Sequence, residues 1–212
     1  MDTYKLQEKI HTVVKESLHI GMTEKELADV ISSVCPYWQG DIISGERSAD
    51  IEGIPTERVI KSGDVVLLDL QVCADGKWSD LTRVYFMGGI SPKQRDAFYR
   101  VSKAIAVGEK MLMPGCKASE IWHNMREAID SPNAFIHHGG HRVGDEDIVA
   151  EPRFVPECED YLTEGMVVTL EPAIYYPGQF GIRLENNYLI TKDGAVRLCS
   201  LGMDADEFTV KG

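Results

Sequence analysis

Apolar residues recur at helical spacing through the first part of the chain. Between residues 4 and 18, one face of a helix would carry Leu6, Ile10, Val13, Val14 and Leu18. A second helix is predicted soon after it, because Thr23 and Glu26 have the spacing of a capping box. The stretch from 35 to 63 is polar and turn-rich, and it separates these two helices from the next apolar segment.

Two more helices are predicted in the middle of the chain. Ser91 is placed as an N-cap, with Pro92 at the first helical position and Gln94 reaching back, and this helix should run to about Met113. The stretch "PGCKASEIWHNMREAI" predicts a further short helix, and strand-like patterns follow at 134–144, 166–176 and 182–190. Two helices followed by a hairpin thus occur twice. This order predicts a single α+β domain, 1–212, with related halves of about 1–90 and 91–212.

The apolar stretch "VVLLDLQVCADGKWSDLTRVY" predicts a β-hairpin that contains two aspartates. With Asp75 and Gly76 as a two-residue turn, Asp69 pairs with Thr82. Asp69 and Asp80 then lie on one face as diagonal neighbours, with Cβ atoms roughly 6–8 Å apart. Their carboxylates repel each other and lose hydration in a half-buried sheet, so a cation is expected between them. The alternative is structural, with Asp80 at the surface near the turn and Asp69 paired with Arg83.

Further polar residues interrupt apolar segments later in the chain and favour the cation. His141 lies between glycines in "GGHRVG", Glu171 ends the apolar run of "VVTLEPAIY", and Glu185 lies inside "GIRLENNYLI". Together with the two aspartates, these residues offer four carboxylates and one imidazole. Four negative charges can neutralise two divalent ions, and this oxygen-rich set suits Mn²⁺, Fe²⁺, Co²⁺ or Zn²⁺. Two such ions sharing one water would support hydrolysis.

Charge and cysteine usage narrow the class of protein. A net charge of −12 without a basic stripe argues against a nucleic-acid partner. No run of about 18 apolar residues occurs, so no membrane span is expected. The five cysteines are odd in number, far apart and without a CxxC motif, which predicts reduced thiols and a cytoplasmic protein.

The motifs "LLDL", "SDLTR", "GGH", "LEP" and "RLEN", in this order and with eight residues between the first two, resemble the pita-bread metallopeptidases. This family includes methionine aminopeptidases, X-Pro aminopeptidases and prolidases, and "EGMVVTLEPAIYYPG" is most similar to the X-Pro branch. The resemblance covers about residues 4 to 200. It implies the pita-bread fold, with two pseudo-symmetric halves in which helices cover a curved antiparallel sheet.

The resemblance also implies roles for individual residues. The implied ligands of two divalent metal ions are Asp69, Asp80, His141, Glu171 and Glu185. Glu171 would in addition carry the proton of the water that bridges the ions. Thr82, Arg83 and Arg183 would support the ligands, with Arg183 holding a carboxylate in place.

Members of the X-Pro branch carry accessory histidines, and the chain departs from that pattern. His137 matches the one four residues before the metal-binding histidine and is the second candidate catalytic residue. At the position of another, seventeen residues before Asp69, this chain has Glu52. Near the third, Val149 is the closest residue, and no histidine follows His141.

Other residues are predicted around the substrate. The candidate substrate pocket contains Glu52, Arg142, Tyr175 and Tyr176. Arg142 would either bind a substrate carboxylate or pair with Glu146. His137 and His138 are expected to point in opposite directions, as alternation in a strand requires.

The resulting hypothesis is a metal-dependent aminopeptidase or dipeptidase that removes the N-terminal residue of a short peptide or splits an X-Pro dipeptide. The missing histidines keep two alternatives open: a peptidase-like binding domain without turnover, and a C–N hydrolase for a non-peptide substrate. The sequence begins at the first helix, so no N-terminal substrate domain is expected. A peptide is the expected partner, and a homodimer is an assembly that the sequence leaves open.

Overall fold

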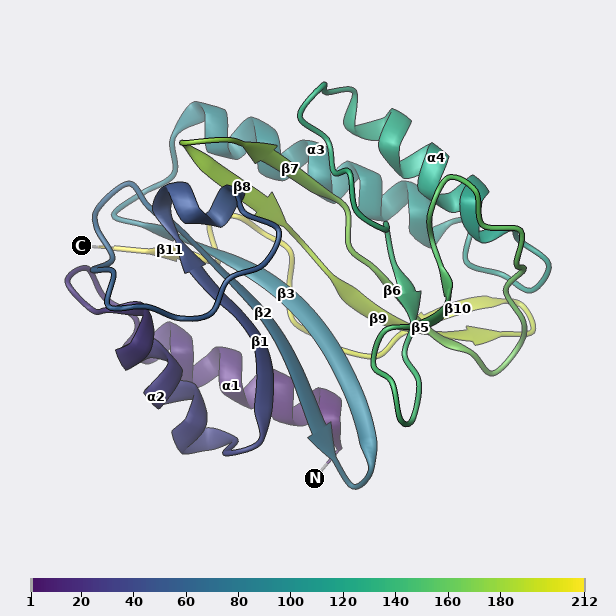
Figure 1. Cartoon of the computed structure of the whole chain (residues 1–212), viewed down its shortest axis with the longest axis horizontal. Coiled ribbons are helices and arrows are strands. Elements are labelled where there is room, and N and C mark those ends of the chain that lie inside the picture. Colours follow the sequence, from purple (N-terminus) through teal and green to yellow (C-terminus); the bar gives the residue numbers. More distant parts are fainter. Residues whose placement is uncertain (1, 212) are drawn as a thin grey trace.

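The computed structural model describes residues 2–211 and contains two helix pairs on opposite sides of a layer of strands (Figure 1). The helices are α1 (Thr3–Ser17), α2 (Glu24–Val34), η1 (Gly45–Ala49), α3 (Pro92–Glu109) and α4 (Ala118–Ile129). The strands of the first half are β1 (Trp38–Ser44), β2 (Val65–Ala74) and β3 (Lys77–Met87). The second half contributes β4 (His141–Arg142), β5 (Ala150–Arg153), β6 (Val167–Leu170), β7 (Ala173–Tyr176), β8 (Phe180–Arg183), β9 (Asn186–Thr191), β10 (Gly194–Arg197) and β11 (Thr209–Val210).

The strands form two larger sheets and one short hairpin. The first sheet has the order β1-β2-β3-β11, and the second has the order β10-β9-β6-β4-β5. Strands β7 and β8 form a separate two-stranded hairpin. The mixture of helices and mainly antiparallel strands confirms the predicted α+β class. The proposed duplication of two halves remains a prediction.

Alternation along β2 and β3 explains why both faces of the first sheet are covered. Val66, Leu68 and Tyr85 belong to an apolar cluster with α1 and α2. Residues of the opposite parity, such as Leu67 and Val84, belong to a second cluster with α3 and α4. The hairpin is therefore the central element of the molecule, and a polar residue in its middle lies between two apolar layers.

The helix starts follow their capping signals. Thr23 with Glu26 and Ser91 with Gln94 form reciprocal capping boxes at α2 and α3, as predicted. Helix α3 ends at Glu109 rather than near Met113.

The strand predictions are less accurate than those for the helices. Strand β1 was not predicted, because Gln39, Gly40 and Asp41 give it a polar, turn-like sequence. It is stabilised by antiparallel pairing with β2 over its whole length. In the stretch 134–144, only two residues form a strand.

Two smaller predictions concern the whole chain. All five cysteines are free. Among residues 2–211, no helix has both the length and the apolar character that crossing a bilayer requires.

Candidate metal centre

The β2–β3 hairpin brings the two aspartates to one side of the first sheet. Its register pairs Asp69 with Thr82 and Gln71 with Asp80, which confirms the register predicted from the turn. Asp75 and Gly76 both have positive φ, 51° and 74°, as a two-residue turn that matches the twist of the strands requires. A single residue more in this turn would move Asp80 to the opposite face.

Strand β9 and the residue before it lie beside β3 and bring a third carboxylate to the aspartates. The backbone N–H of Glu185 donates to the carbonyl of Thr82 at 3.1 Å. The backbone N–H of Asp80 donates to Oδ1 of Asn187 at 3.1 Å, and the amide of Asn187 donates in return to the Asp80 carbonyl. These contacts between the halves fix Asp80 next to Glu185.

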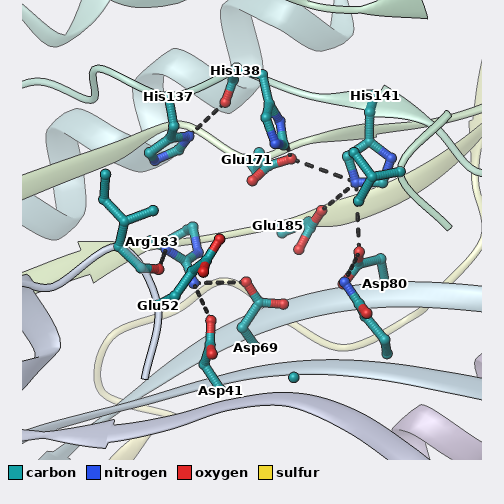
Figure 2. A pocket seen from close by; sticks show the side chains of 14 residues that line it. Asp41, Glu52, Asp69, Asp80, His137, His138, His141, Glu171, Arg183 and Glu185 are labelled. Carbon is teal, nitrogen blue, oxygen red and sulfur yellow. Dashed lines mark hydrogen bonds and ion pairs between the residues drawn. The ribbon is translucent and has the colours of Figure 1, made fainter. Parts of the chain in front are cut away.

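The remaining two residues come from β4 and from the end of β6. Nε2 of His141 lies 3.5 Å from Asp80 Oδ2, 3.6 Å from Glu171 Oε1 and 3.8 Å from Glu185 Oε1 (Figure 2). These residues and Asp69 line a cavity of about 210 Å³. The structure therefore brings together the five residues singled out as ligands, although they lie up to 116 positions apart between Asp69 and Glu185.

Several oxygen atoms of the cavity are buried without a hydrogen-bond partner. They are Asp69 Oδ1, Asp80 Oδ1 and Glu185 Oε1. Buried carboxylate oxygens in that state are costly unless a cation lies between them. One ligand atom each from Asp80, His141 and Glu185 lie within 4.8 Å of one another. The residues present therefore fit divalent metal ions.

The electrostatics of the cavity also favour a bound cation. Burial, and then the charge of Asp69, raises the pKa of Asp80 to about 7. Burial and the charge of Asp80 also raise the pKa of Glu185 well above its usual value. Burial alone would lower the pKa of His141, but the hydrogen bond to Asp80 and the charge of Glu171 raise it to about 9. The protein alone does not supply enough positive charge to keep these carboxyl groups ionised.

Glu171 differs from its neighbours. Burial would raise its pKa, but the charge and hydrogen bond of His138 and the charge of His141 lower it to about 2. Its carboxylate is therefore ionised at neutral pH.

Each of the three predicted supporting residues contacts a candidate ligand. Thr82 Oγ1 donates to Glu185 Oε2 at 2.9 Å, and Arg83 Nη1 donates to the Glu185 carbonyl at 2.7 Å. Arg183 Nη2 donates to Asp69 Oδ2 at 2.7 Å. The bonds from Thr82 and Arg183 limit the orientations of two carboxylates, and the bond from Arg83 holds the backbone at Glu185, as contacts around metal ligands generally do.

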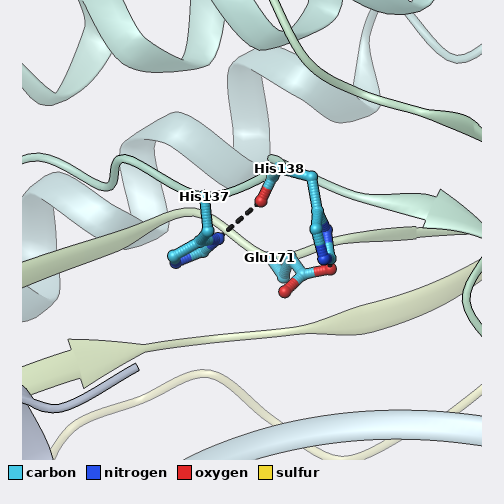
Figure 3. A group of neighbouring side chains, drawn as sticks. All are labelled: His137, His138 and Glu171. Carbon is cyan, nitrogen blue, oxygen red and sulfur yellow. Dashed lines mark hydrogen bonds and ion pairs between the residues drawn. The ribbon is translucent and has the colours of Figure 1, made fainter. Parts of the chain in front are cut away.

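Both histidines of the pair His137–His138 line the cavity, so the prediction that they point in opposite directions is wrong (Figure 3). Residues 137–140 are not in a strand, and the alternation rule does not apply to them. His138 Nδ1 lies 3.0 Å from Glu171 Oε1. No role for His138 is predicted from the sequence, where its signal is the doubled histidine next to "GGH".

His137 uses both ring nitrogens within the protein. Arg183 Nη1 donates to the Tyr175 hydroxyl at 2.7 Å, so that hydroxyl donates onward to His137 Nε2 at 2.9 Å. Nδ1 then carries the proton and donates to the His138 carbonyl at 2.6 Å. Burial lowers the pKa of His137 to about 4, in agreement with this neutral form.

The four residues predicted around the substrate divide into two groups. Glu52 lines the cavity, and Tyr175 reaches it through its bonds to His137 and Arg183. Tyr176 instead lies under Lys93, whose Nζ is 4.0 Å from the ring centroid, and it does not line the cavity. Arg142 also lies outside it, because Nε donates to the Glu151 carbonyl at 2.7 Å. Within residues 2–211 its pairing with Glu146 is not found, and its predicted contact with a substrate stays a prediction.

Two cavity residues on the hairpin side were not predicted. Asp41 pairs with Asp69 across β1 and β2, and its Oδ2 lies 3.6 Å from Arg183 Nη2. Burial raises the pKa of Asp41 to about 6. Gln71 donates to Asp80 Oδ2 at 3.0 Å. Asp41 was missed because β1 was missed.

A family model, described as metallopeptidase family M24, matches residues 2–192. The chain belongs to the M24 metallopeptidase family. Among curated proteins, this M24 chain is 36% identical over 193 residues to the Xaa-Pro dipeptidase of Pyrococcus furiosus, covering 86% of this chain and 55% of that protein. The chain spans about half the length of the curated relatives it matches.

Solved structures of a prolidase and an X-Pro aminopeptidase have the same fold as this chain. The prolidase from Pyrococcus furiosus superposes with a TM-score of 0.89 at 32% identity, covering 94% of this M24 chain and 62% of that chain. An X-Pro aminopeptidase from Thermotoga maritima superposes with a TM-score of 0.91 at 26% identity, covering 98% and 60%. The M24 chain has the pita-bread fold that the sequence predicted.

Proposed function

We propose that this M24 chain is a metal-dependent peptidase domain that removes the N-terminal residue of short peptides or splits X-Pro dipeptides. The observation that carries this proposal is the convergence of four buried or half-buried carboxylates and His141 on one cavity, with three carboxylate oxygens left without a hydrogen-bond partner. The names of the similar proteins, Xaa-Pro dipeptidase and X-Pro aminopeptidase, support the choice of substrate class.

The proposed ligands of two divalent ions, Mn²⁺, Fe²⁺, Co²⁺ or Zn²⁺, are Asp69, Asp80, His141, Glu171 and Glu185. When bound, such ions polarise a scissile carbonyl and lower the pKa of water to about 7. Glu171 lines the cavity, and we assign to its carboxylate the proton transfer that the family resemblance implies: it would take the proton that an attacking water loses and return it to the leaving amine. Arg183 keeps Asp69 in one orientation.

A second candidate is a peptidase-like domain that binds peptides without turnover. It is favoured by Glu52 and Val149, which line the cavity at the two positions where the family resemblance predicts histidines. Losing one donor to the reacting oxygen typically lowers turnover by about 10²–10³-fold. His138 adds a third imidazole to the cavity beside His137 and His141, which favours the enzyme.

The experiment that tests the proposal measures bound metal and hydrolysis together. The purified protein is loaded with each metal and assayed on X-Pro dipeptides, longer X-Pro peptides and Met-peptides. We expect two ions per chain, and we expect Asp80→Asn to lower kcat/KM by at least about 10³-fold. Asp29→Asn, at an exposed position on α2, is the matched control and should leave both quantities unchanged. If the protein binds two ions and a peptide but does not hydrolyse the peptide, the proposed peptidase activity is wrong and the peptide-binding domain is the better proposal.

The compartment and the partners are proposed from the cysteines and the net charge. The free cysteines support the cytoplasm as the proposed compartment. The net charge of −12 argues against a nucleic-acid partner, and a homodimer stays a proposal for size analysis.

A further inference from the structure

Glu52 is a carboxylate of the cavity that is not among the proposed metal ligands. The lining contains six carboxylates, from Asp41, Glu52, Asp69, Asp80, Glu171 and Glu185, and a single permanent cation, Arg183. Two divalent ions and Arg183 together would carry five positive charges. The six negative charges therefore exceed these positive charges by one when the histidines are neutral.

The guanidinium of Arg183 is already committed to other groups. Nη2 lies 2.7 Å from Asp69 Oδ2 and 3.6 Å from Asp41 Oδ2. Nη1 donates to the Tyr175 hydroxyl and to the Ile51 carbonyl. Among residues 2–211, no hydrogen bond or ion pair to the Glu52 carboxylate is found within bonding distance. Glu52 therefore lies exposed on the cavity wall, where its carboxylate is open to a ligand.

The backbone on both sides of Glu52 is held by cavity residues. Before it, the Ile51 carbonyl accepts the bond from Arg183 at 3.0 Å. After it, the Gly53 N–H donates to Asp41 Oδ1 at 2.9 Å. A Cβ at Gly53 would lie 2.5 Å from Ile43 Cγ2, so the segment packs closely against β1 at this point. Glu52 is thus presented from a fixed segment, and fixing a charge in advance lowers the entropy that binding costs.

The buried side chain of Glu24 holds the part of the segment that follows Glu52. Glu24 accepts bonds from Thr56 N and Oγ1 at 3.0 and 2.7 Å, and Arg47 bonds to it as well. Arg47 Nη2 in turn donates to the Ile54 carbonyl at 3.1 Å. The chain from η1 to Thr56 is therefore anchored on both of its sides, and Glu52 lies between the anchors.

We propose that Glu52 selects substrates with a positive charge, and that it binds the ammonium group of a lysine side chain in preference to a neutral or acidic residue. The cavity offers Ile51 and Val149 as aliphatic contacts, which suit the stem of a lysine. This inference rests on the proposed function, since it concerns the substrate of the same cavity. The α-ammonium group of the peptide is the other source of the same chemistry.

The test compares metal-loaded wild type, Glu52→Gln and Asp50→Asn on three ligands: Lys-Pro, norleucyl-Pro and Nα-acetyl-Lys-Pro. Glu52→Gln removes the charge and keeps the shape. Asp50→Asn is the matched control, because Asp50 is exposed on the same segment and does not line the cavity. The measured quantity is kcat/KM where the ligand is hydrolysed, and Kd by calorimetry where it is not.

Wild type and Asp50→Asn should prefer Lys-Pro over norleucyl-Pro by about five-fold, the upper end for a solvent-exposed ion pair. Glu52→Gln should abolish this preference, and salt should weaken it in the wild type. Glu52→Gln could instead leave the preference for Lys-Pro over norleucyl-Pro unchanged and abolish only the loss of kcat/KM or affinity that Nα-acetylation causes. In that case the bound group is the α-ammonium and the lysine assignment is wrong. The inference would be overturned if wild type and Glu52→Gln gave the same ratio of Lys-Pro to norleucyl-Pro and the same ratio of Lys-Pro to Nα-acetyl-Lys-Pro. It would also be overturned if none of the three ligands bound. Preference without hydrolysis would overturn only the proposed peptidase activity.

Discussion

Two buried histidines lie on opposite faces of the β2–β3 hairpin, and their surroundings have opposite effects. His11 and His141 are both 1% exposed. On the α1 side, burial and then the charge of Arg83 lower the pKa of His11 to about 3. In the cavity, Asp80 and Glu171 outweigh burial and raise the pKa of His141 to about 9. Burial alone therefore does not identify a functional histidine.

The difference lies in the neighbours of each ring. His11 has one polar partner, the Tyr85 hydroxyl at 2.9 Å from Nδ1, and its Nε2 has none. His141 has three carboxylates within 4 Å of Nε2. The α1 side is an apolar layer that tolerates one neutral imidazole, whereas the cavity concentrates negative charge that a cation must balance. The α1 histidine is structural, and the cavity histidine is a candidate ligand.

The largest effect is expected from replacing His141, and the same replacement at His11 serves as the comparison. His141→Gln should lower the number of bound ions below two and lower kcat/KM by at least about 10³-fold, because a ligand is lost. His11→Gln should leave metal content unchanged, since His11 belongs to α1 and its ring contacts Tyr85 of β3 on the face opposite the cavity. Metal analysis and steady-state kinetics on the same samples check both. If His11→Gln folded normally but bound less metal, the structural role assigned to His11 would be wrong.

A smaller effect is expected from Arg183, which supports the cavity without being a candidate ligand. Arg183→Lys keeps the charge but loses the planar fork that reaches both Asp69 and Tyr175. We expect a loss of about 10–100-fold in metal affinity or kcat/KM, with the fold intact. Isothermal titration with Mn²⁺ measures the affinity. An unchanged affinity together with unchanged kinetics would show that Arg183 does not orient Asp69.

The smallest effect concerns the stability of the α1 side at low pH. The unfolded chain binds a proton at His11 near pH 6.5, while the folded pKa is about 3. Stability contributed by neutral His11 is therefore complete above pH 6.5 and is lost as the pH falls toward 3, at up to about 1.4 kcal/mol per pH unit. Urea unfolding of wild type and His11→Gln between pH 7 and 5 measures this slope. The wild type should lose more stability than the variant, and parallel curves would contradict the assignment.

Much of the site arrangement follows from local sequence signals. Asp75 and Gly76 specify the turn, the turn specifies the register, and the register brings Asp69 and Asp80 to one face. The capping boxes begin α2 and α3 for equally local reasons. His141, Glu171 and Glu185 were singled out because they interrupt apolar or glycine-rich segments, and the family resemblance implied that they share one metal site with the hairpin. No local pattern places them there, because their contacts with the hairpin span more than 60 positions.

The errors arise where tertiary contacts override local patterns. Strand β1 forms because β2 offers its edge, although the β1 sequence is polar, and Asp41 was missed with it. Tyr176 follows Tyr175 in a strand, so only one of the two can face the cavity. The positions of Arg142 and His138 depend on irregular backbone around β4, where periodicity gives no direction.

The most direct test of the account is to locate the ions. Crystals of the protein grown or soaked with Mn²⁺ would be measured for anomalous scattering at the manganese edge. Two peaks in the cavity, enclosed by Asp69, Asp80, His141, Glu171 and Glu185, are the predicted result. Peaks only at exposed acidic side chains, or no peak in the cavity at a saturating Mn²⁺ concentration, would contradict the central claim that these carboxylates converge to hold two metal ions.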